Sequence, residues 1–254
     1  MNFISLASSS SGNAYIIYNN KQELILLDAG ISHRRIKKKL NTLSLDVNDI
    51  KYVLLTHCHS DHISGLSTLI KRVNPLIVTH KINAPFMEQY NGDMLLFDYN
   101  DNFLLDSFSV NALAASHDVP TVSFVIKEND SGKSLGFVSD TGIISRYTFE
   151  AISSVNFLAL ESNYSVNHLD YAPYPEHVKL RIASNRGHLS NDQALTIMKE
   201  LPRRLKEFLL IHISRNSNSP QTVKNEVLEH YIKLNNSSNC YLSPYDDCSL
   251  EFII

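Results

Sequence analysis

The sequence predicts an α/β fold in which several strands end at one common edge. Apolar runs typical of buried strands alternate along the chain with segments of helical spacing. Six of the apolar runs finish in a His, Asp or Glu, namely Asp28, His57, His117, Asp140, Glu161 and His212. A polar residue at one strand end is common, but six of this chemical type indicate that the C-terminal strand ends converge on one site.

Composition limits the class of protein. A chain of 254 residues can form one domain or two, and no repeat, linker or composition shift marks a boundary, so we expect one domain over residues 1–254. The net charge of -3 excludes a global basic field, so any nucleic-acid contact must use a local patch. Three cysteines without metal-finger spacing favour a reducing compartment. No signal peptide and no apolar run near the ~18 residues of a membrane span are visible, so we expect a cytoplasmic protein without membrane contact.

The first elements are two strands within residues 3–18, joined by a Ser-rich polar turn, and a strand over residues 24–27 that leads into Asp28. A helix is expected to begin near Ser32, whose side chain suits an N-cap. Its exposed positions include Arg34, Arg35, Lys37, Lys38 and Lys39. Such a basic run is either a solvated face or, if it lies beside the site, a contact for a phosphate backbone.

The central motif is residues 56–62, which read THCHSDH. It follows an apolar strand over residues 52–55 and precedes helical spacing over residues 63–70, so it lies on a strand-to-helix turn. His57 and His59 point the same way on extended backbone, whereas Asp61 and His62 open the helix and face a second point nearby. A lone histidine is usually a surface or core residue, but imidazole and carboxylate together are the usual transition-metal ligands. The motif therefore predicts two adjacent metal ions.

The remaining chain continues the alternation. Strands are expected over residues 76–78, 107–114, 122–126, 135–138, 157–160 and 208–211, with hairpin-like segments at 94–97 and 102–105 and one or two final strands. Residues 129–132, Asn-Asp-Ser-Gly, form a good hairpin turn. Helices are expected over 85–90, from Ser190 or Asn191 to about residue 201, and over 220–232. The stretch 168–187 is rich in Tyr and Pro and then basic, and receives no assignment.

The strand ends and the motif together supply the ligands that two ions need. We assign His57, His59 and His117 to the first ion, Asp61, His62 and His212 to the second, and Asp140 as a bridge. Two ions roughly 3.5–4 Å apart can clamp the attacking and leaving oxygens and lower the pKa of water from 15.7 to about 7. The expected chemistry is therefore hydrolysis without a Ser or Cys nucleophile. Three imidazoles favour Zn, while the carboxylates of the second position also suit Mn or Fe.

These residues carry a family resemblance. THCHSDH matches the HxHxDH motif of the metallo-β-lactamase superfamily, and His117, Asp140 and His212 follow in the order of its later ligand motifs. Asp28 matches the early strand-end Asp that orients the ligands from behind. Within the superfamily the chain is similar to the YycJ/VicX (WalJ) subfamily over residues 5–13, 116–118, 161–163, 186–191 and 212–214. The resemblance covers nearly the whole chain.

The resemblance implies an αβ/βα four-layer sandwich, in which two mixed sheets face each other with helices outside. It implies a metal-dependent phosphodiesterase acting on nucleic acid, a 5′-to-3′ exonuclease on double-stranded DNA. Glu161 and His188 resemble a Glu and Gly-His pair in ribonuclease Z and the β-CASP nucleases, so Glu161 would orient His188 to contact the scissile phosphate and protonate the leaving oxygen. Asp61 would act as a ligand and catalytic group. Arg215 either reaches a phosphate or simply ends a strand. Without that role His188 is simply a histidine at a helix start.

Three alternatives remain open. A thioester or lactone hydrolase of the glyoxalase type shares the central motif, but it needs neither the Glu161–His188 pair nor a basic helix. A di-iron redox protein normally has Glu at the second histidine of the motif, so His59 argues against it. A non-catalytic scaffold would lack some ligands, and all of those proposed are present. Cys58 as a nucleophile would need a base, which histidines bound to metal cannot provide.

Overall fold

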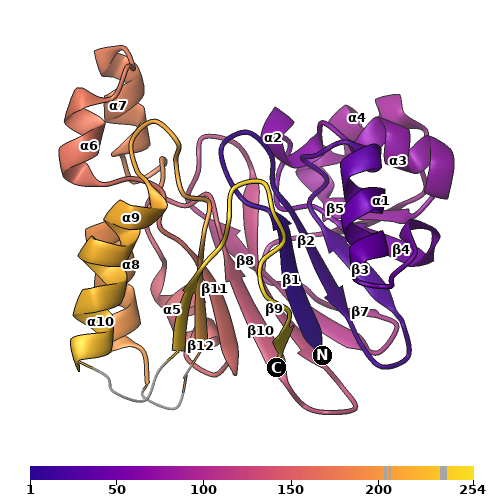
Figure 1. The fold of residues 1–254 in the computed structure, drawn as a ribbon. Coiled ribbons are helices and arrows are strands. Elements are labelled where there is room, and N and C mark those ends of the chain that lie inside the picture. Colours follow the sequence, from indigo (N-terminus) through magenta and orange to yellow (C-terminus); the bar gives the residue numbers. More distant parts are fainter. Residues whose placement is uncertain (203–204, 206, 235–238) are drawn as a thin grey trace.

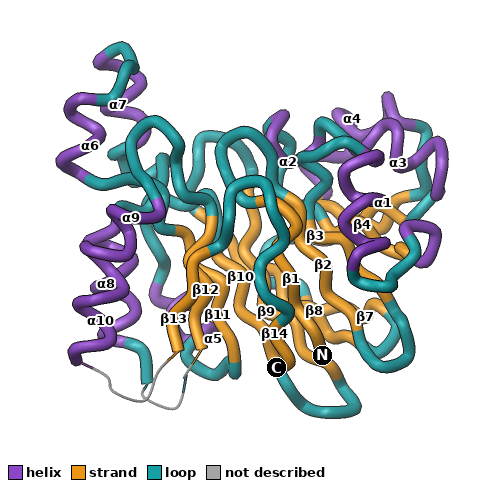
Figure 2. Tube along the Cα trace, viewed as in Figure 1, coloured by secondary structure: helices purple, strands orange, loops and turns teal. Residues whose placement is uncertain are grey.

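The computed structural model describes residues 1–202, 205, 207–234 and 239–254 and contains two seven-stranded sheets that face each other (Figure 1). Helices cover the outer face of each sheet, so the architecture has four layers (Figure 2). The sandwich implied by the sequence resemblance is therefore confirmed. None of the described helices combines the length and apolar character needed to span a bilayer.

The first sheet has the strand order β14-β1-β2-β3-β4-β5-β6. Its strands are β1 (Asn2–Ala7), β2 (Ala14–Tyr18), β3 (Leu24–Leu27), β4 (Ile50–Leu54), β5 (Leu76–His80), β6 (Met94–Phe97) and β14 (Phe252–Ile253). Strands β1 to β3 pair antiparallel, and β3 to β6 pair parallel. Because β3 and β4 run in the same direction, the residues that follow them emerge at the same edge of the sheet.

The second sheet has the order β13-β12-β11-β10-β9-β8-β7. Its strands are β7 (Asn102–Leu105), β8 (Phe108–Ala115), β9 (Thr121–Glu128), β10 (Ser134–Val138), β11 (Phe157–Glu161), β12 (Glu207–Ile211) and β13 (Asn239–Leu242). Strands β7 to β10 are antiparallel and β10 to β13 parallel. Strands β8, β10, β11 and β12 therefore all point the same way, and their C-terminal ends share one edge.

The helices divide between the two outer faces. Helices α1 (His33–Thr42), α3 (Leu66–Val73) and α4 (Ala84–Met87) pack on the first sheet, and the short α2 (Ser60–Ile63) precedes α3. Helices α5 (Arg146–Ile152), α8 (Asn191–Glu200), α9 (Pro220–Val223) and α10 (Glu229–Leu234) pack on the second. Helices α6 (Val166–Tyr171) and α7 (Glu176–Ile182) project past the end of the second sheet (Figure 1). Ser32 and Ser190 cap α1 and α8 as expected, and Gln193 completes a capping box at α8.

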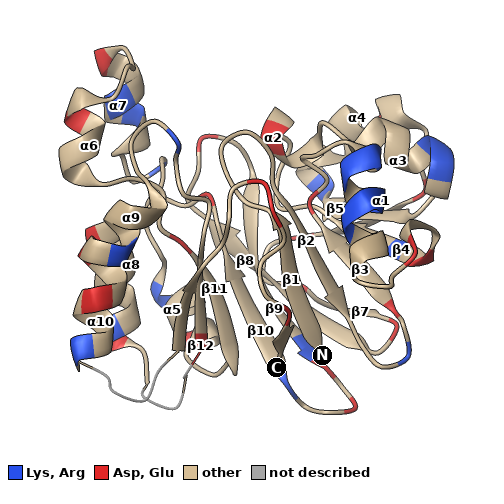
Figure 3. Ribbon diagram, in the orientation of Figure 1, with Lys and Arg blue, Asp and Glu red and all other residues tan. Residues whose placement is uncertain are grey.

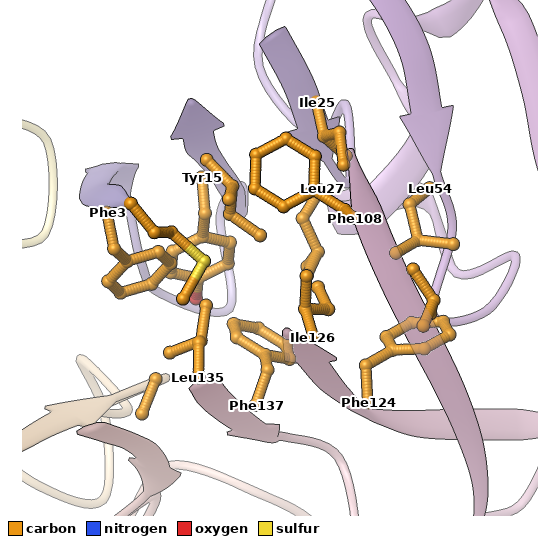
Figure 4. Close-up of a cluster of buried hydrophobic side chains, with 14 of the residues drawn as sticks. Phe3, Tyr15, Ile25, Leu27, Leu54, Phe108, Phe124, Ile126, Leu135 and Phe137 are labelled. Atoms are coloured by element: carbon orange, nitrogen blue, oxygen red, sulfur yellow. The ribbon is translucent and has the colours of Figure 1, made fainter. Parts of the chain in front are cut away.

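Aromatic side chains fill the space between the two sheets (Figure 4). Tyr15 packs edge-on against Phe137 with ring centroids 4.8 Å apart, and Phe3 lies 5.7 Å from Phe157. All four rings are fully buried, and each pair joins a strand of one sheet to a strand of the other. Close packing of this kind fixes how one sheet sits on the other, and therefore fixes the relative positions of their strand ends.

Two expectations about local structure are wrong. The helical spacing over residues 63–70 is interrupted, because α2 ends at Ile63 and α3 begins at Leu66. Gly65 lies in the break, where its N–H donates to the Ala29 carbonyl at 2.8 Å, and a Cβ there would lie 1.9 Å from the Ile31 carbonyl oxygen. Only glycine allows this close approach of backbone to backbone.

The hairpin-like segments are strands, but they do not pair with each other. β6 joins the edge of the first sheet beside β5, and β7 joins the edge of the second beside β8. Residues 98–101 thus carry the chain from one sheet to the other. Helices α5, α6 and α7 were not predicted, and the helix expected over 220–232 contains a π-helical turn, Lys224–Leu228, between α9 and α10.

Gly30→Ala is expected to destabilise the fold by about 3 kcal/mol or more, because the new Cβ would lie 1.6 Å from the Asp61 carbonyl oxygen. Urea unfolding followed by circular dichroism measures the change. Gly132→Ala is the control: no atom lies within 4 Å, and the cost there is only that of its positive φ, about 1–2 kcal/mol. Equal losses in the two variants would show that the contact with Asp61 does not matter.

Candidate metal centre

The polar strand ends of both sheets meet at one edge of the sandwich. In the first sheet, Asp28 follows β3 and His57 follows β4. In the second sheet, Glu161 ends β11, and the residues that follow β8, β10 and β12 are His117, Asp140 and His212. All six are buried. Their meeting at one point was expected from the strand-end pattern.

Three of these residues have positive φ: Asp28 at 59°, Asp140 at 53° and His212 at 54°. This left-handed conformation costs a non-glycine residue roughly 1–2 kcal/mol. It turns the chain sharply at the end of each strand, where the strand would otherwise continue past the site. Such residues cluster at functional sites, where the surrounding structure holds them in place.

The first donor group consists of His57, His59 and His117, whose ligand atoms lie within 4.8 Å of one another. His57 Nε2 and His59 Nδ1 are 3.0 Å apart. His117 Nδ1 donates to the Gly187 carbonyl at 3.0 Å, so its Nε2 is left with a lone pair. That Nε2 is buried and has no hydrogen-bond partner among the described residues.

The second donor group consists of Asp61, His62 and His212, again with ligand atoms within 4.8 Å of one another. The far nitrogen of each imidazole contacts a fully buried carboxylate. His62 Nδ1 lies 2.7 Å from Asp28 Oδ2, and His212 Nδ1 lies 2.8 Å from Glu161 Oε1. Each Nε2 then lies near Asp61 Oδ2, at 3.4 Å and 3.6 Å. His212 Nε2 is a second buried nitrogen that forms no hydrogen bond with the described residues.

Asp140 lies between the two groups. Its Oδ2 is 3.4 Å from His62 Nε2 and its Oδ1 is 3.4 Å from His212 Nδ1. It also forms a close set with His57 and His62, and another with Glu161, His188 and His212. A carboxylate in this position can contact an ion in either donor group.

The buried carboxylates give this edge a negative potential. Burial opposes ionisation of Asp140, but His212 and His62 hold its pKa well below the usual range. Burial lowers the pKa of His212, yet Asp140, Asp61 and Glu161 raise it to about 10. Burial also opposes protonation of His62, but Asp140 and Asp28 raise its pKa well above the usual value. Burial lowers the pKa of His57. The second donor group therefore holds protons unless another cation supplies the positive charge.

The donor chemistry fits divalent metal ions. Neutral imidazole and carboxylate are the ligands that zinc and its neighbours prefer. Two imidazole nitrogens, one in each group, are buried without a hydrogen bond, which is costly unless another atom binds them. The orienting partners behind the ligands are also present: Asp28 behind His62, Glu161 behind His212 and the Gly187 carbonyl behind His117.

Glu161 has a wider role than the sequence suggested. Its Oε1 lies 2.8 Å from Nδ1 of His188 and also 2.8 Å from Nδ1 of His212. Its Oε2 accepts from the backbone N–H groups of Thr141 and Leu189, each at 3.2 Å. Because Nδ1 of His188 contacts Glu161, the other ring nitrogen stays free for contacts in the cavity that His188 lines. One buried carboxylate thus positions both His188 and His212.

Glu161→Gln is expected to weaken metal affinity by about 10- to 100-fold, because the amide can no longer accept from both imidazoles without offering its own N–H. Competition with a fluorescent chelator measures the affinity, and circular dichroism checks the fold. Glu200→Gln, on the outer helix α8, is the matched control. Unchanged affinity would mean that Glu161 serves His188 alone.

The donor groups open into a cavity of about 290 Å³. Part of its lining comes from the α7 region and includes Tyr174, Val178, Arg181 and Ile182. Arg181 pairs with Asp118, and Arg186 Nε donates to the His117 carbonyl at 3.0 Å. The projecting α6–α7 segment, for which no structure was predicted, therefore forms one side of the site and braces the loop that carries His117.

The residues predicted to bind nucleic acid do not line the cavity. In the described chain, Arg181 is the basic residue that lines the cavity, whereas Arg34, Arg35, Lys37, Lys38 and Arg215 do not. Arg35 and Arg215 both pair with Asp246, which offsets their charge. Figure 3 shows basic residues on α1 and, across the site, on α7. Nothing in the sequence pattern distinguished Arg181 from other basic residues.

Two facing mixed sheets with a His/Asp cluster at their common edge define the metallo-β-lactamase class of fold. The model of the Beta-lactamase superfamily domain matches residues 23–213, and the chain belongs to this superfamily. It is 30% identical to "Exodeoxyribonuclease YycJ" of Bacillus anthracis over 233 residues, which are 89% of this chain and 88% of that protein. It is 30% identical to "Exodeoxyribonuclease WalJ" of Streptococcus pneumoniae serotype 2 over 221 residues, 84% of this chain and 81% of that protein.

Among solved structures, the metallo-β-lactamase fold protein YhfI of Bacillus subtilis superposes with a TM-score of 0.75 and covers 99% of each chain at 15% identity. At that identity the likeness concerns the fold alone. The family resemblance drawn from the sequence is confirmed, and the chain is a hydrolase of the metallo-β-lactamase fold with His/Asp clusters suited to divalent metal.

Proposed function

We propose that this hydrolase is a phosphodiesterase acting on nucleic acid, specifically a 5′-to-3′ exonuclease on double-stranded DNA. The observation that carries the proposal is the His188–Glu161 pair, which places an imidazole in the cavity beside Asp140. Cleavage of a phosphodiester needs a proton on the leaving oxygen, which His188 can supply. Hydrolysis of a small thioester does not require a histidine in this role. The names of the relatives, exodeoxyribonucleases, support the same reading.

In this proposal seven side chains hold two divalent ions, of Zn, Mn or Fe. His57, His59 and His117 would hold one, Asp61, His62 and His212 would hold the other, and Asp140 could contribute to either. Divalent ions supply Lewis-acid charge at a phosphate and lower the pKa of water from 15.7 to about 7. Asp28 and Glu161 keep the tautomers of His62 and His212 such that Nε2 faces the site.

His188 serves as the general acid. Its Nδ1 contacts Glu161 Oε1 at 2.8 Å, so the buried carboxylate fixes the orientation of the imidazole. The remaining ring nitrogen can then give a proton to the oxygen of the departing nucleotide. Arg181 and Tyr174, which also line the cavity, are placed to contact the phosphate and sugar or base of the strand. We place the activity in the cytoplasm, as cysteine usage indicates.

Digestion of end-labelled nucleic acids tests this function. Single- and double-stranded DNA and RNA are incubated with the protein and Zn, Mn or Fe, in parallel with a thioester substrate. We expect release of the 5′ label as mononucleotide, before loss of the 3′ label, most rapidly from double-stranded DNA. Hydrolysis of the thioester with no attack on any strand would instead establish the glyoxalase-type alternative.

A further inference from the structure

A second cavity, of about 360 Å³, lies between the start of α1 and the exposed side of α3. We name it the α1–α3 pocket. Its lining residues are Ser32, His33, Arg34, Lys37, Thr68 and Arg72. None of them lines the catalytic cavity. It is therefore a separate feature, and neither the metal centre nor the fold accounts for its composition.

The positive charge of the α1–α3 pocket is not neutralised. Arg34, Lys37 and Arg72 form no ion pair with any residue that the structure describes, whereas Arg35 on the same helix pairs with Asp246 at 2.9 Å. The first turn of α1 contains no acidic residue. Three cations in one cavity repel one another, so the arrangement favours an anionic ligand.

His33 gives a second and independent indication of a ligand. Its residue is only 9% exposed, it lines the pocket, and its side chain has no hydrogen-bond partner in the described part of the chain. Burial, together with Arg72 and Lys37, holds the pKa of His33 below its ordinary value, so the imidazole is a neutral donor. A neutral imidazole that lines the pocket and has no partner can donate its N–H to a bound anion.

The start of α1 adds backbone donors. The Ser32 side chain accepts from the N–H of Arg35, and the helix has ten residues, enough for a full dipole. The N–H groups of His33 and Arg34, at the first two helical positions, have no intrahelical acceptor. Backbone N–H groups at a helix start, joined by arginine and lysine side chains, are suited to phosphate.

We propose that the α1–α3 pocket binds a phosphate of the nucleic-acid strand a few nucleotides away from the bond that is cleaved. This assignment rests on the proposed function, since it takes the strand to be the substrate. Gly30 touches the backbone of Asp61, and the three residues from Gly30 to His33 span at most about 11 Å. A strand advances about 3.4 Å per nucleotide, so one short strand can reach both places.

The pocket also revises the basic surface expected from the sequence. It retains Arg34 and Lys37 and adds Arg72 and His33 from outside the predicted set. It leaves out Arg35 and Arg215, which share Asp246, and Lys38, which does not line it. This division supplies matched variants. Arg34→Ala with Arg72→Ala empties the pocket of two charges, and Lys38→Ala with Lys71→Ala removes two exposed charges from the same two helices outside it.

The test measures the affinity of each variant for a phosphorothioate-linked DNA strand, which resists cleavage, by fluorescence anisotropy over about 50 to 200 mM salt. We expect the pocket pair to bind about tenfold more weakly, with a salt slope flatter by about 0.7, the value for one phosphate contact. The control pair should change the slope much less. Equal changes in the two pairs would overturn the pocket and leave only general surface charge. Circular dichroism confirms that both pairs are folded.

Two further arms separate the possible failures. Titration with inorganic phosphate, followed by calorimetry, shows whether the pocket takes a free phosphate. If the pocket pair loses phosphate binding but keeps the wild-type affinity for the strand, the strand assignment is overturned. Hydrolysis of bis(p-nitrophenyl) phosphate, which has no strand, should be the same in the wild type and the pocket pair. If the wild type hydrolyses no phosphodiester at all, the proposed function fails, and the strand-binding arm still decides on the pocket.

Discussion

Asp140→Ala is expected to lower the rate of hydrolysis by about 10³-fold or more. Asp140 lies 3.4 Å from imidazole nitrogens of His62 and His212 in the second donor group, and it forms a close set with His57 of the first, so its loss affects both groups. A bound ion contributes several kcal/mol of charge stabilisation in the transition state, and each 1.4 kcal/mol is a factor of ten. Steady-state turnover and the metal content of the purified protein, by mass spectrometry, measure the result.

Asp130→Ala is the control for this variant. Asp130 lies in the β9–β10 turn and pairs with Lys21 at the surface, so its substitution should leave rate and metal content unchanged. Full activity in Asp140→Ala would remove Asp140 from the ligand set and would require another bridge between the donor groups. A normal rate with half the metal would show that a single ion is sufficient.

His188→Ala is expected to lower phosphodiester turnover by about 10²- to 10⁴-fold, the usual contribution of a general acid, while metal content stays that of the wild type. The imidazole contacts Glu161 and lines the cavity but belongs to neither ligand triad. Hydrolysis of a substrate with a good leaving group, such as p-nitrophenolate, should fall less, because that leaving oxygen needs no proton. Comparison of the two substrates separates acid catalysis from a general disturbance.

His177→Ala, on the exposed face of α7, is the matched histidine control and should leave turnover unchanged. A loss of metal in His188→Ala would mean that His188 is a ligand. Equal losses on both substrates would mean that it positions the phosphate and does not protonate the leaving group. His188→Ala is expected to affect turnover alone, whereas Glu161→Gln is expected to weaken metal affinity as well. Comparison of the two variants therefore separates the role of His188 from that of Glu161.

The strand-end pattern made much of this centre predictable. Apolar runs that finish in Asp28, His57, Asp140 or His212 are local features, and the parallel order of strands then brings their ends together. Helix starts were equally readable, because Ser32 and Ser190 cap the helices that follow them through local hydrogen bonds. Both kinds of signal depend on only a few neighbouring residues.

Other features depend on distant contacts and left little trace in the sequence. Helices α6 and α7 have six and seven residues, too few for a clear period, and are held by a small cluster that includes Tyr164, Leu169 and Ile182. The strands β6 and β7 look like a hairpin because they are close in sequence, but their partners lie in different sheets. The second partner of Glu161 could not be foreseen, since it comes from a strand end about fifty residues later.

The origin of the donors in both sheets has a consequence for how the chain acquires activity. Asp28 to His62 come from the first sheet, and His117 to His212 come from the second. No fragment that contains only one sheet can assemble the set, and during synthesis the set stays incomplete until β12 has been added beside β11. If these residues form the centre, a chain that is still being made or is only partly folded is expected to lack activity.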